Sequence, residues 1–550
     1  MSFPVSQSMC QSARAMSASP PSTPSATSPP ASPPASDAPG SEPVVHPYRW
    51  AILVSLLLAA LRMYEFTSQD FAIDDAWISF RIARNWLEAG TLTFDLTQPP
   101  VEGMTNFLWT VLSALWIAPM RDVDPLFTAR AVGALCHLGT VGLSARLAAR
   151  LAASQGGGER TAALVTGGLL ALSGSLAFHA LAGMETSFYT LLFVLALDRG
   201  LEARSGRTGP AVACGVFLGL LGMTRPEGVL VGLLFLGLMA LWPETRRNLW
   251  RAALPFVCLI GGLELFRLWT YGALVPNTYQ AKPPSPVDGW KYFREFALYG
   301  LGVVGPLATV PALRRSAFAR GMAVVALVLA AGTVWSGGDW MPGYRRFSVT
   351  MVGLAVLVGA GVALARGAWR VPSLVAAAAV LAGHLWASLN LWDANLFPTR
   401  AMVSLALAAN ATPGVKTVAL TDIGRFGYYY SGSIFDLAGL TDAHIARQAG
   451  RHMAKEWDEA YFLSRKPDLL IVNSTSDITR PDTRELRVHW VEVGPLQTLQ
   501  HHGGYRFVTS LDLEGNKYLV VLAREDLELP EDVWGPGLRR ELSEFTIGTM

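Results

Sequence analysis

Long apolar stretches recur between Trp50 and about Leu391, separated by short loops, and no other feature constrains the fold as strongly. Several of them approach the roughly 20 residues that a helix needs to cross a bilayer. Only 16% of the 550 residues are charged, whereas soluble proteins carry about 25%, so the chain cannot cover a water-facing surface with charge. The sequence therefore predicts a mainly α, multi-spanning membrane protein.

Arginine placement gives the predicted orientation, because arginine-rich loops are retained on the cytoplasmic side. A cluster of arginines follows every second apolar segment, as alternating crossings require. The five clusters are Arg146, Arg150 and Arg160; Arg199, Arg204 and Arg207; Arg246, Arg247 and Arg251; Arg314, Arg315 and Arg320; and Arg366 and Arg370. We expect about eleven spans and a cytoplasmic N-terminus. Thr105 to Met120 is short and is expected to dip into the outer interface without crossing.

The chain divides into three predicted parts. Residues 1–45 form a cytoplasmic tail rich in Pro, Ser and Ala, which we expect to be disordered because it cannot bury enough apolar surface to fold. Residues 46–391 form the transmembrane domain. Residues 392–550 mix polar and apolar side chains and are predicted to form a soluble α/β domain, which the odd number of spans places outside the cell. Its strand-like runs are Lys416 to Leu420, Asp468 to Val472 and Lys517 to Leu522.

The charge and the potential ligand residues narrow the function further. The net charge is +2, which gives no case for nucleic-acid binding. The four cysteines and nine histidines show no metal-ligand spacing. We therefore expect no metal site, and the sequence leaves a divalent-cation requirement open.

The first outer loop holds two adjacent carboxylates, Asp74 and Asp75, beyond the first apolar segment. Such groups are costly near a membrane unless they are paired or hydrated, and Arg81 follows about two helical turns later. One interpretation is an ion pair that caps a helix. The other is a general base with an orienting partner, while Arg81 binds a phosphate or carboxylate. The location favours the second, because a water-soluble acceptor and a lipid-borne donor can meet only at this interface.

The other outer loops supply candidates for binding a donor phosphate or substrate. They are Glu102, Thr105 and Asn106; Glu185; Arg225; Asn277 and Lys282; and Asp339, Trp340 and Arg345. Some have structural alternatives, since Glu185 can cap the next helix, Arg225 can be a paired helix-end charge, and Lys282 can be an ordinary interface lysine. Asp339 and Arg345 lie in a loop of Trp, Pro and Gly that structure alone seldom needs, which favours a functional role.

Taken in order, these motifs resemble those of the GT-C superfamily, whose members keep an acidic pair in the first extracytoplasmic loop and take a sugar from a polyprenyl phosphate. They are most similar to the terminal arabinofuranosyltransferase family of the mycobacterial cell wall and its bacterial relatives. The matching elements are Asp74-Asp75-Ala76 with Ile78-Ser79-Phe80-Arg81, Glu102-Gly103-Met104-Thr105-Asn106, Gly183-Met184-Glu185-Thr186, Thr224-Arg225-Pro226-Glu227-Gly228, Pro276-Asn277-Thr278 with Lys282, and Gly338-Asp339-Trp340-Met341-Pro342-Gly343-Tyr344-Arg345. The resemblance covers Ile73 to Ile445 and departs at Arg425-Phe426, where smaller residues are expected.

The resemblance implies a glycosyltransferase of the bacterial plasma membrane with its active site outside. The donor would be a polyprenyl phosphate sugar, arabinofuranose in the closest family, and the acceptor a cell-envelope glycan or glycoconjugate. Asp74 or Asp75 would be the general base of a single inverting displacement. The cations implied at the phosphate are Arg81, Arg225, Lys282 and Arg345.

Two alternatives are less well supported. Nucleotide sugars are not expected as donors, because the chain has no Rossmann fingerprint and the motifs face outward. A transporter or flippase of a lipid-linked saccharide would also carry charged residues at membrane helices. However, the polar motifs cluster in outer loops and not at mid-membrane, and no inverted repeat is visible.

The arginine pattern makes a topology prediction. A reporter fused after Arg207 or Arg370 should be cytoplasmic, whereas one fused after Met550 should be outside, because an odd number of spans separates the two ends of the membrane domain. Protease accessibility of each fusion in intact cells measures this. A cytoplasmic signal from the Met550 fusion would contradict the orientation.

Overall fold

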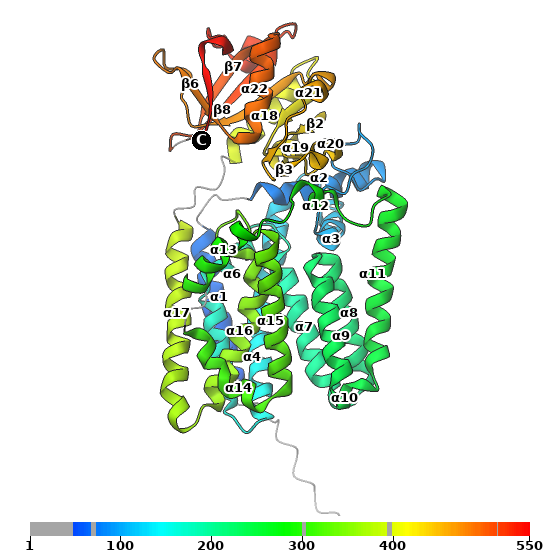
Figure 1. The fold of residues 1–550 in the computed structure, drawn as a ribbon, viewed down its shortest axis with the longest axis vertical. Helices are drawn as coiled ribbons and strands as arrows, with labels where there is room; N and C mark the ends of the chain where they lie inside the picture. The colour runs from blue at the N-terminus through cyan, green and yellow to red at the C-terminus, as the bar shows by residue number, and fades with distance from the viewer. Residues whose placement is uncertain (1–47, 68–72, 300–303, 393–398, 514) are drawn as a thin grey trace, which may run out of the picture. The chain divides into compact units, whose positions relative to one another are not determined.

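The structure is a computed structural model that describes residues 48–67, 73–299, 304–392, 399–513 and 515–550 (Figure 1). The predicted tail, residues 1–45, lies outside the described residues. The described chain is mainly helical up to Trp392 and combines helices with a sheet from Thr399 onward. This arrangement confirms the predicted fold class, a helical membrane domain followed by an α/β domain.

Six helices of the described chain are long and apolar enough to cross a membrane. They are α1 (Arg49–Thr67), α4 (Pro125–Ala153), α11 (Leu249–Tyr271), α15 (Ala317–Ser336), α16 (Ser348–Leu364) and α17 (Arg370–Trp392). The helices α5 (Glu159–Ala171) and α6 (Gly174–Leu181) are bent by 57° relative to each other. If this pair counts as one span, the number of candidate spans rises to seven. The chain is therefore a multi-pass membrane protein.

The predicted count of about eleven spans is not confirmed. The helices α8 (Thr208–Thr224) and α9 (Glu227–Leu241) are apolar but shorter, and α7 (Thr186–Ala203) carries a buried Asp198. The described residues before the arginine cluster at Arg314 and Arg315 belong to shorter elements. These are α13 (Pro286–Tyr299), η1 (Gly305–Thr309) and α14 (Val310–Arg315).

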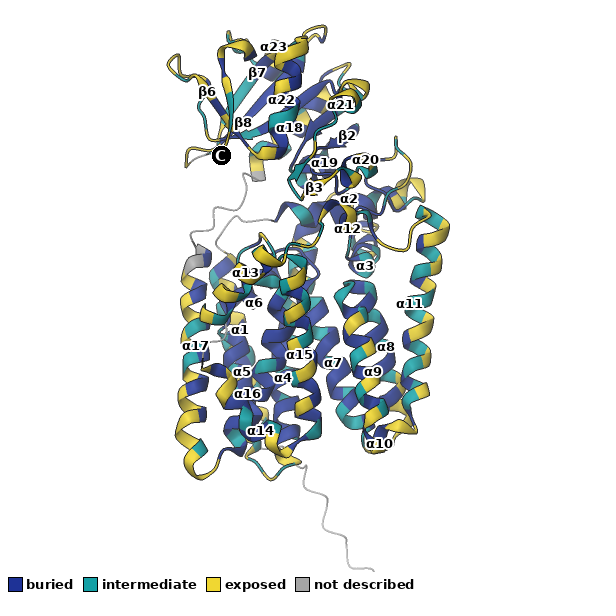
Figure 2. Ribbon diagram, viewed as in Figure 1, coloured by how far each residue is buried: buried dark blue, intermediate teal, exposed yellow. Residues whose placement is uncertain are grey.

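Apolar side chains on the outside of the helices indicate contact with lipid. Figure 2 shows exposed residues along the outer faces of α11 and α17. They include Leu254, Val257 and Leu265 on α11 and Val371 and Leu374 on α17, each more than half exposed. Large exposed apolar surfaces are rare on soluble monomers. A bilayer accounts for them.

Short helices cap one end of the bundle. They are α2 (Asp74–Ala89), α3 (Phe107–Ile117) and α12 (Asn277–Ala281). At 1.5 Å per residue, α3 is about half as long as the ~30 Å hydrocarbon core, so it cannot cross the membrane alone. This length fits the prediction that Thr105 to Met120 does not span. The helix α10 (Pro243–Arg246) lies at a turn between longer helices.

The C-terminal domain is built on a seven-stranded mixed sheet. Its strands are β1 (Thr417–Leu420), β2 (Ser433–Asp436), β5 (Leu469–Ser474), β6 (Glu485–Val488), β7 (Tyr505–Asp512), β8 (Tyr518–Arg524) and β9 (Thr546–Thr549). The strand order is β2-β1-β5-β6-β9, and β8 pairs with both β5 and β7. Strand β5 is buried almost throughout, as a strand covered on both faces requires. The three predicted strand regions correspond to β1, β5 and β8.

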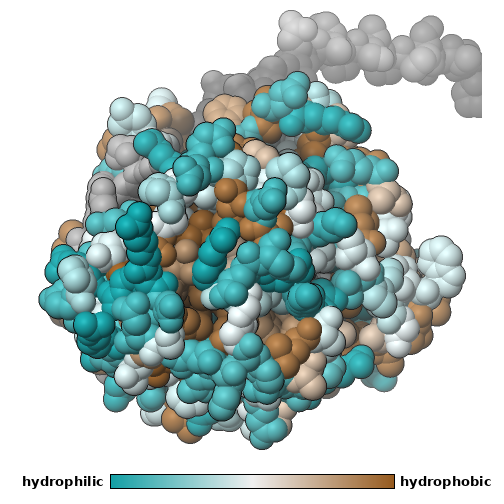
Figure 3. All heavy atoms as spheres, turned by 90° about the horizontal axis from the view of Figure 1, so that it is seen from above, coloured by the Kyte–Doolittle hydropathy of each residue, from teal (hydrophilic) through white to brown (hydrophobic). Residues whose placement is uncertain are grey.

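Helices and a small hairpin complete this domain. The helices are α18 (Thr399–Ala411), α19 (Ile423–Tyr429), α20 (Ala443–Arg447), α21 (Glu459–Arg465), α22 (Trp490–His502) and α23 (Glu531–Trp534). The hairpin pairs β3 (Gly450–Arg451) with β4 (Ala454–Lys455). Seen from above, most side chains are hydrophilic (Figure 3), which suits a surface in water.

A shared apolar core joins α2 to the C-terminal domain. Ile78 and Ile82 of α2 and Met104 of the following loop pack in one cluster with Ile423 and Phe426 of α19. Burying each such side chain contributes roughly 1.5–3 kcal/mol. Helix α2 and the C-terminal domain therefore pack together around the site described next.

Candidate active site

A cavity of about 580 Å³ lies where the helix ends, the short outer helices and the C-terminal domain meet. Its lining contains nine of the thirteen residues predicted from the sequence: Asp75, Thr105, Asn106, Glu185, Arg225, Lys282, Asp339, Trp340 and Arg345. The other four, Asp74, Arg81, Glu102 and Asn277, do not line it. Folding therefore gathers six separate sequence motifs at one place.

The two adjacent aspartates point to different surroundings, because successive side chains on a helix diverge by about 100°. Asp74 is buried, and its carboxylate accepts hydrogen bonds from the backbone N–H of Gly424 (2.6 Å) and of Arg425 (2.8 Å). Both groups belong to the first turn of α19. Burial raises the pKa of Asp74 to about 6, although these two hydrogen bonds oppose the shift. Asp74 holds the C-terminal domain on α2.

Asp75, by contrast, lines the cavity. Within the residues that the structure describes, its carboxylate makes no hydrogen bond or ion pair. Burial raises its pKa, while the charges of Lys282 and Arg345 act in the opposite direction. Asp75 is therefore the carboxylate of the pair that is available to a substrate.

Arg81 makes structural contacts with the backbone. Its guanidinium donates to the carbonyl oxygens of Phe94 (2.8 Å), Gly432 (2.9 Å), Tyr430 (3.3 Å) and Gly427. The carbonyl of Gly427 lies within α19, and those of Tyr430 and Gly432 lie just beyond it. Because its donors are occupied in this way and it does not line the cavity, we assign it to the contact between α2 and the C-terminal domain.

Glu102 and Asn277 also hold segments together. Both carboxylate oxygens of Glu102 accept from Nε of Arg267, at 3.0 and 3.1 Å. Burial raises the pKa of Glu102 to about 7, and the charge of Arg267 opposes this shift. The amide of Asn277 donates to the carbonyl oxygens of Gly439 (2.9 Å) and Leu440 (3.0 Å) in the C-terminal domain.

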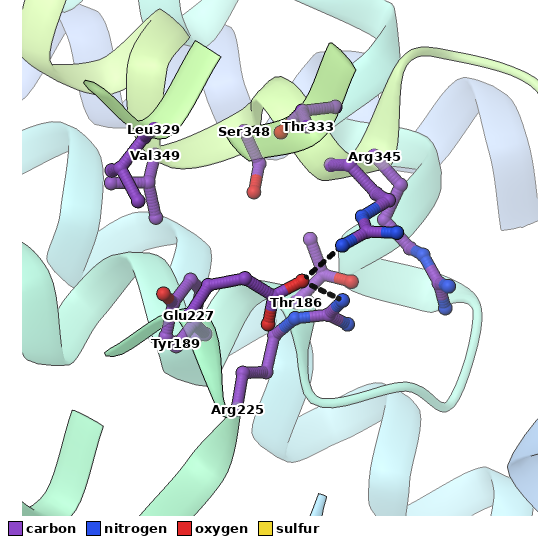
Figure 4. A pocket seen from close by; sticks show the side chains of 10 residues that line it. Thr186, Tyr189, Arg225, Glu227, Leu329, Thr333, Arg345, Ser348 and Val349 are labelled. Carbon is purple, nitrogen blue, oxygen red and sulfur yellow. Dashed lines mark hydrogen bonds and ion pairs between the residues drawn. The ribbon is translucent and has the colours of Figure 1, made fainter. Parts of the chain in front are cut away.

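One wall of the cavity is a network of ion pairs and hydrogen bonds. The amide of Asn106 donates to Glu185 (3.0 Å), and Arg225 forms an ion pair with the same carboxylate. One oxygen of Glu227 accepts from both Arg225 (3.2 Å) and Arg346 (2.6 Å). Figure 4 shows Arg225 and Glu227 beside a smaller cavity of about 20 Å³ that shares these residues with the larger one. The network fixes Arg225, which is therefore less available to a ligand.

The loop from Gly337 to Tyr344 also lines the cavity, next to this network, and its backbone requires glycine. Gly337 and Gly338 have φ of 100° and 76°, and Gly343 has φ of 82°. A Cβ on Gly338 would lie 2.6 Å from the Tyr292 ring. This geometry explains the glycines of the motif and holds the loop in one conformation.

This loop positions Arg345. Its Nε donates to Asp339 at 2.7 Å, and both side chains are about nine-tenths buried. Burial by itself would raise the pKa of Asp339. The charges of Arg345 and other nearby cations have the larger, opposite effect, so the pKa lies below its usual range. Nη1 of Arg345 is buried and has no hydrogen-bond partner among the described residues. Lys282, which is exposed in the cavity, likewise has none. These two groups can bind an anion.

Sequence reasoning missed several cavity residues, among them Arg346, Arg451 and His452. Arg346 donates a hydrogen bond to Glu227. The adjacent pair Arg345-Arg346 in the sequence could have identified it as a site residue. Arg451 and His452 come from the β3–β4 hairpin, which no pattern in the sequence marks as close to the motifs. Among the described residues, no group of three or more His, Cys, Asp or Glu is placed to hold a metal ion.

Comparison with known proteins gives a family match for the C-terminal part alone. Residues 394–526 match a family described as a domain of unknown function, DUF8728. No curated protein sequence matches the chain.

Solved structures align with a much larger part of the chain. ArnT from Cupriavidus metallidurans, bound to undecaprenyl phosphate, is 14% identical and aligns over 88% of this chain and 100% of its own, with a TM-score of 0.54. The archaeal oligosaccharyltransferase AglB from Archaeoglobus fulgidus, in complex with an inhibitory peptide and a dolichol-phosphate, is 12% identical over 88% of this chain and 74% of its own, with a TM-score of 0.51. The chain therefore has the GT-C fold, as the motifs predicted.

The mycobacterial arabinofuranosyltransferase AftD is also similar, at 15% identity over 86% of this chain and 41% of its own. Its TM-score of 0.48 is too low to support an argument about the sugar.

The contact of Asp74 with α19 predicts a loss of stability. In Asp74→Asn the amide has one acceptor oxygen, so one buried N–H of α19 loses its partner at a cost of about 1–3 kcal/mol. The thermal unfolding midpoint of the purified protein should fall. Asp75→Asn is the matched control and should unfold near the wild-type temperature. Equal midpoints for both variants would show that Asp74 does not hold the domain.

Proposed function

We propose that this protein is a membrane glycosyltransferase that transfers a sugar from a polyprenyl phosphate to a cell-envelope glycan or glycoconjugate. One observation carries the proposal: the same cavity contains an unpaired carboxylate, Asp75, and two cationic groups free to bind a phosphate, on Lys282 and Arg345. Solved structures with this fold contain undecaprenyl phosphate and a dolichol-phosphate, which supports a lipid-linked donor. The extracytoplasmic side is proposed from the arginine pattern, and the bacterial plasma membrane from the motif resemblance.

The lining suits a ligand that is part lipid and part sugar phosphate. Leu230 of α9 and Leu329 and Trp335 of α15 line the cavity, and Leu230 and Trp335 are exposed. Apolar side chains at helix ends suit the first isoprene units of the donor. Its phosphate would then lie against Lys282 and Arg345.

The chemistry is a single displacement at the anomeric carbon. A hydroxyl oxygen of the acceptor forms the new bond to this carbon, while the bond to the phosphate oxygen breaks and polyprenyl phosphate leaves. Asp75 takes the proton of the attacking hydroxyl. Lys282 and Arg345 stabilise the charge that develops on the departing phosphate. Attack opposite the leaving group inverts the anomeric configuration.

Asp75 can act as a base near neutral pH. Burial raises its pKa above the usual range near 4, which brings it toward the operating pH and makes the carboxylate a stronger base. Lys282 and Arg345 limit this shift and so favour the ionised form. We assign the general base to Asp75 and the positioning of the C-terminal domain to Asp74.

The alternative function is that of a transporter or flippase, and the geometry of the site favours it less. Glu185, Arg225 and Glu227 lie at or beside the first residues of α7 and α9, and residues of the C-terminal domain form part of the cavity lining. Transport pathways place their polar groups near mid-membrane. The sugar remains open, and arabinofuranose is proposed from the motif resemblance alone.

Loss of the Asp75 carboxylate tests the proposed base. Purified protein incubated with a polyprenyl phosphate sugar and an acceptor should release polyprenyl phosphate, measured by mass spectrometry. Asp75→Asn should reduce this release by at least ~10²-fold, because removing a general base typically costs that much. Its thermal midpoint provides the folding control. Near-normal turnover by a folded Asp75→Asn would exclude Asp75 as the base.

The cationic groups give a second prediction. Arg345→Lys keeps the charge but loses the planar guanidinium, so it cannot contact Asp339 and a phosphate at the same time. The kcat/KM for the donor should fall by about 10-fold or more, as expected for lost charge-assisted hydrogen bonds. Arg294→Lys, at an exposed position on α13 outside the cavity, is the matched control. Unchanged donor kinetics for Arg345→Lys would remove this residue from the phosphate site.

A further inference from the structure

The cavity has an outer wall that the displacement chemistry does not use. Arg451 and His452 of the β3–β4 hairpin and Asp288 of α13 line it there. These residues lie outside every motif recognised in the sequence. An acceptor must nevertheless bind close to Asp75 for its hydroxyl to be deprotonated, and the hairpin brings two residues of the C-terminal domain into the same cavity.

The hairpin is attached to the membrane domain at a defined point. Nζ of Lys455 donates to the carbonyl oxygen of Gln280 at 3.0 Å. Gln280 lies in α12, two residues before Lys282, which we assign to the donor phosphate. Lys455 itself does not line the cavity. The hairpin is therefore held beside the reacting groups by a contact that is separate from the site.

Arg451 is available for a ligand. Its side chain is exposed in the cavity and, within the described part of the chain, it makes no hydrogen bond or ion pair. Asp288 is close enough to respond to its charge: the pKa of Asp288 is lowered by a hydrogen bond from Ser285, then by the charges of Lys291 and Arg451. A free guanidinium offers five N–H donors in a planar fork, which suits neighbouring hydroxyls.

His452 supplies an uncharged partner. Burial and the charge of Lys282 lower its pKa to about 3, so the imidazole is neutral at physiological pH. Its Nδ1 is buried and has no hydrogen-bond partner among the described residues. Lys282, Arg451 and His452 all line the same cavity.

The charge of the lining indicates the class of acceptor. Five basic and five acidic side chains line the cavity, so it is balanced before any substrate binds. The donor phosphate adds one negative charge, and an anionic acceptor would add another in the same space at an electrostatic cost. A neutral glycan would not.

We propose that the β3–β4 hairpin forms the acceptor subsite and that Arg451, beside His452, hydrogen-bonds the hydroxyls of a neutral glycan so that one hydroxyl faces Asp75. This inference rests on the proposed function and names the substrate class of the same site. It makes Arg451 a residue of acceptor recognition with no role in donor binding.

Binding of a neutral arabinofuranosyl disaccharide to the purified full-length protein tests the proposal without turnover. Saturation-transfer NMR gives the Kd. Arg451→Ala should raise the Kd by about 10-fold or more, the effect of losing charge-assisted hydrogen bonds. Arg447→Ala, an exposed position on α20 outside the cavity, should bind as the wild type does. Lys455→Met releases the hairpin without changing the lining and should also weaken binding.

The possible results distinguish a failure of the acceptor subsite from a failure of the proposed function. An unchanged Kd for Arg451→Ala, or no binding by the wild type, overturns the acceptor subsite. Tighter binding of the same disaccharide carrying a carboxylate overturns the neutral class. Failure of the wild type to release polyprenyl phosphate from any donor overturns the proposed function, and that assay does not depend on Arg451.

Discussion

The contact between the Asp74 carboxylate and the first turn of α19 determines how the two domains meet. A negative charge at a helix N-terminus accepts backbone N–H groups that have no partner within the helix. Both oxygens of Asp74 are used, and Arg81 of α2 donates further hydrogen bonds to the carbonyl oxygens of Gly427 within α19 and Gly432 just beyond it. Without these contacts, the wall that carries Arg451 would not be fixed beside Asp75.

Burying the carboxylates of this arrangement disfavours their charged form. Burial raises the pKa of both Asp74 and Glu102, and each is stabilised by a defined partner, the N–H groups of α19 or Arg267. Asp75 has no such partner. Two neighbouring residues of the same type thus have different roles, one holding a domain and the other facing the substrate space.

The sequence was informative wherever the signal is local. Apolar segments identified the membrane class, and strand-like runs located β1, β5 and β8. The motifs identified nine residues of the cavity. The sequence could not show that Asp74 caps α19 or that Arg81 binds backbone carbonyls beside it, because these contacts join segments about 350 residues apart. The β3–β4 hairpin has only two residues in each strand and no periodicity, so Arg451 and His452 gave no signal.

A structure of the protein with bound undecaprenyl phosphate is the most direct measurement of the central claim, that one cavity joins the base to a lipid phosphate site. The account predicts the phosphate within hydrogen-bonding distance of Arg345 and Lys282 and on the same side of the cavity as Asp75. It also predicts the polyprenyl chain beside Leu230 and Trp335. A phosphate bound elsewhere, with Asp75 turned away from it, would contradict the account.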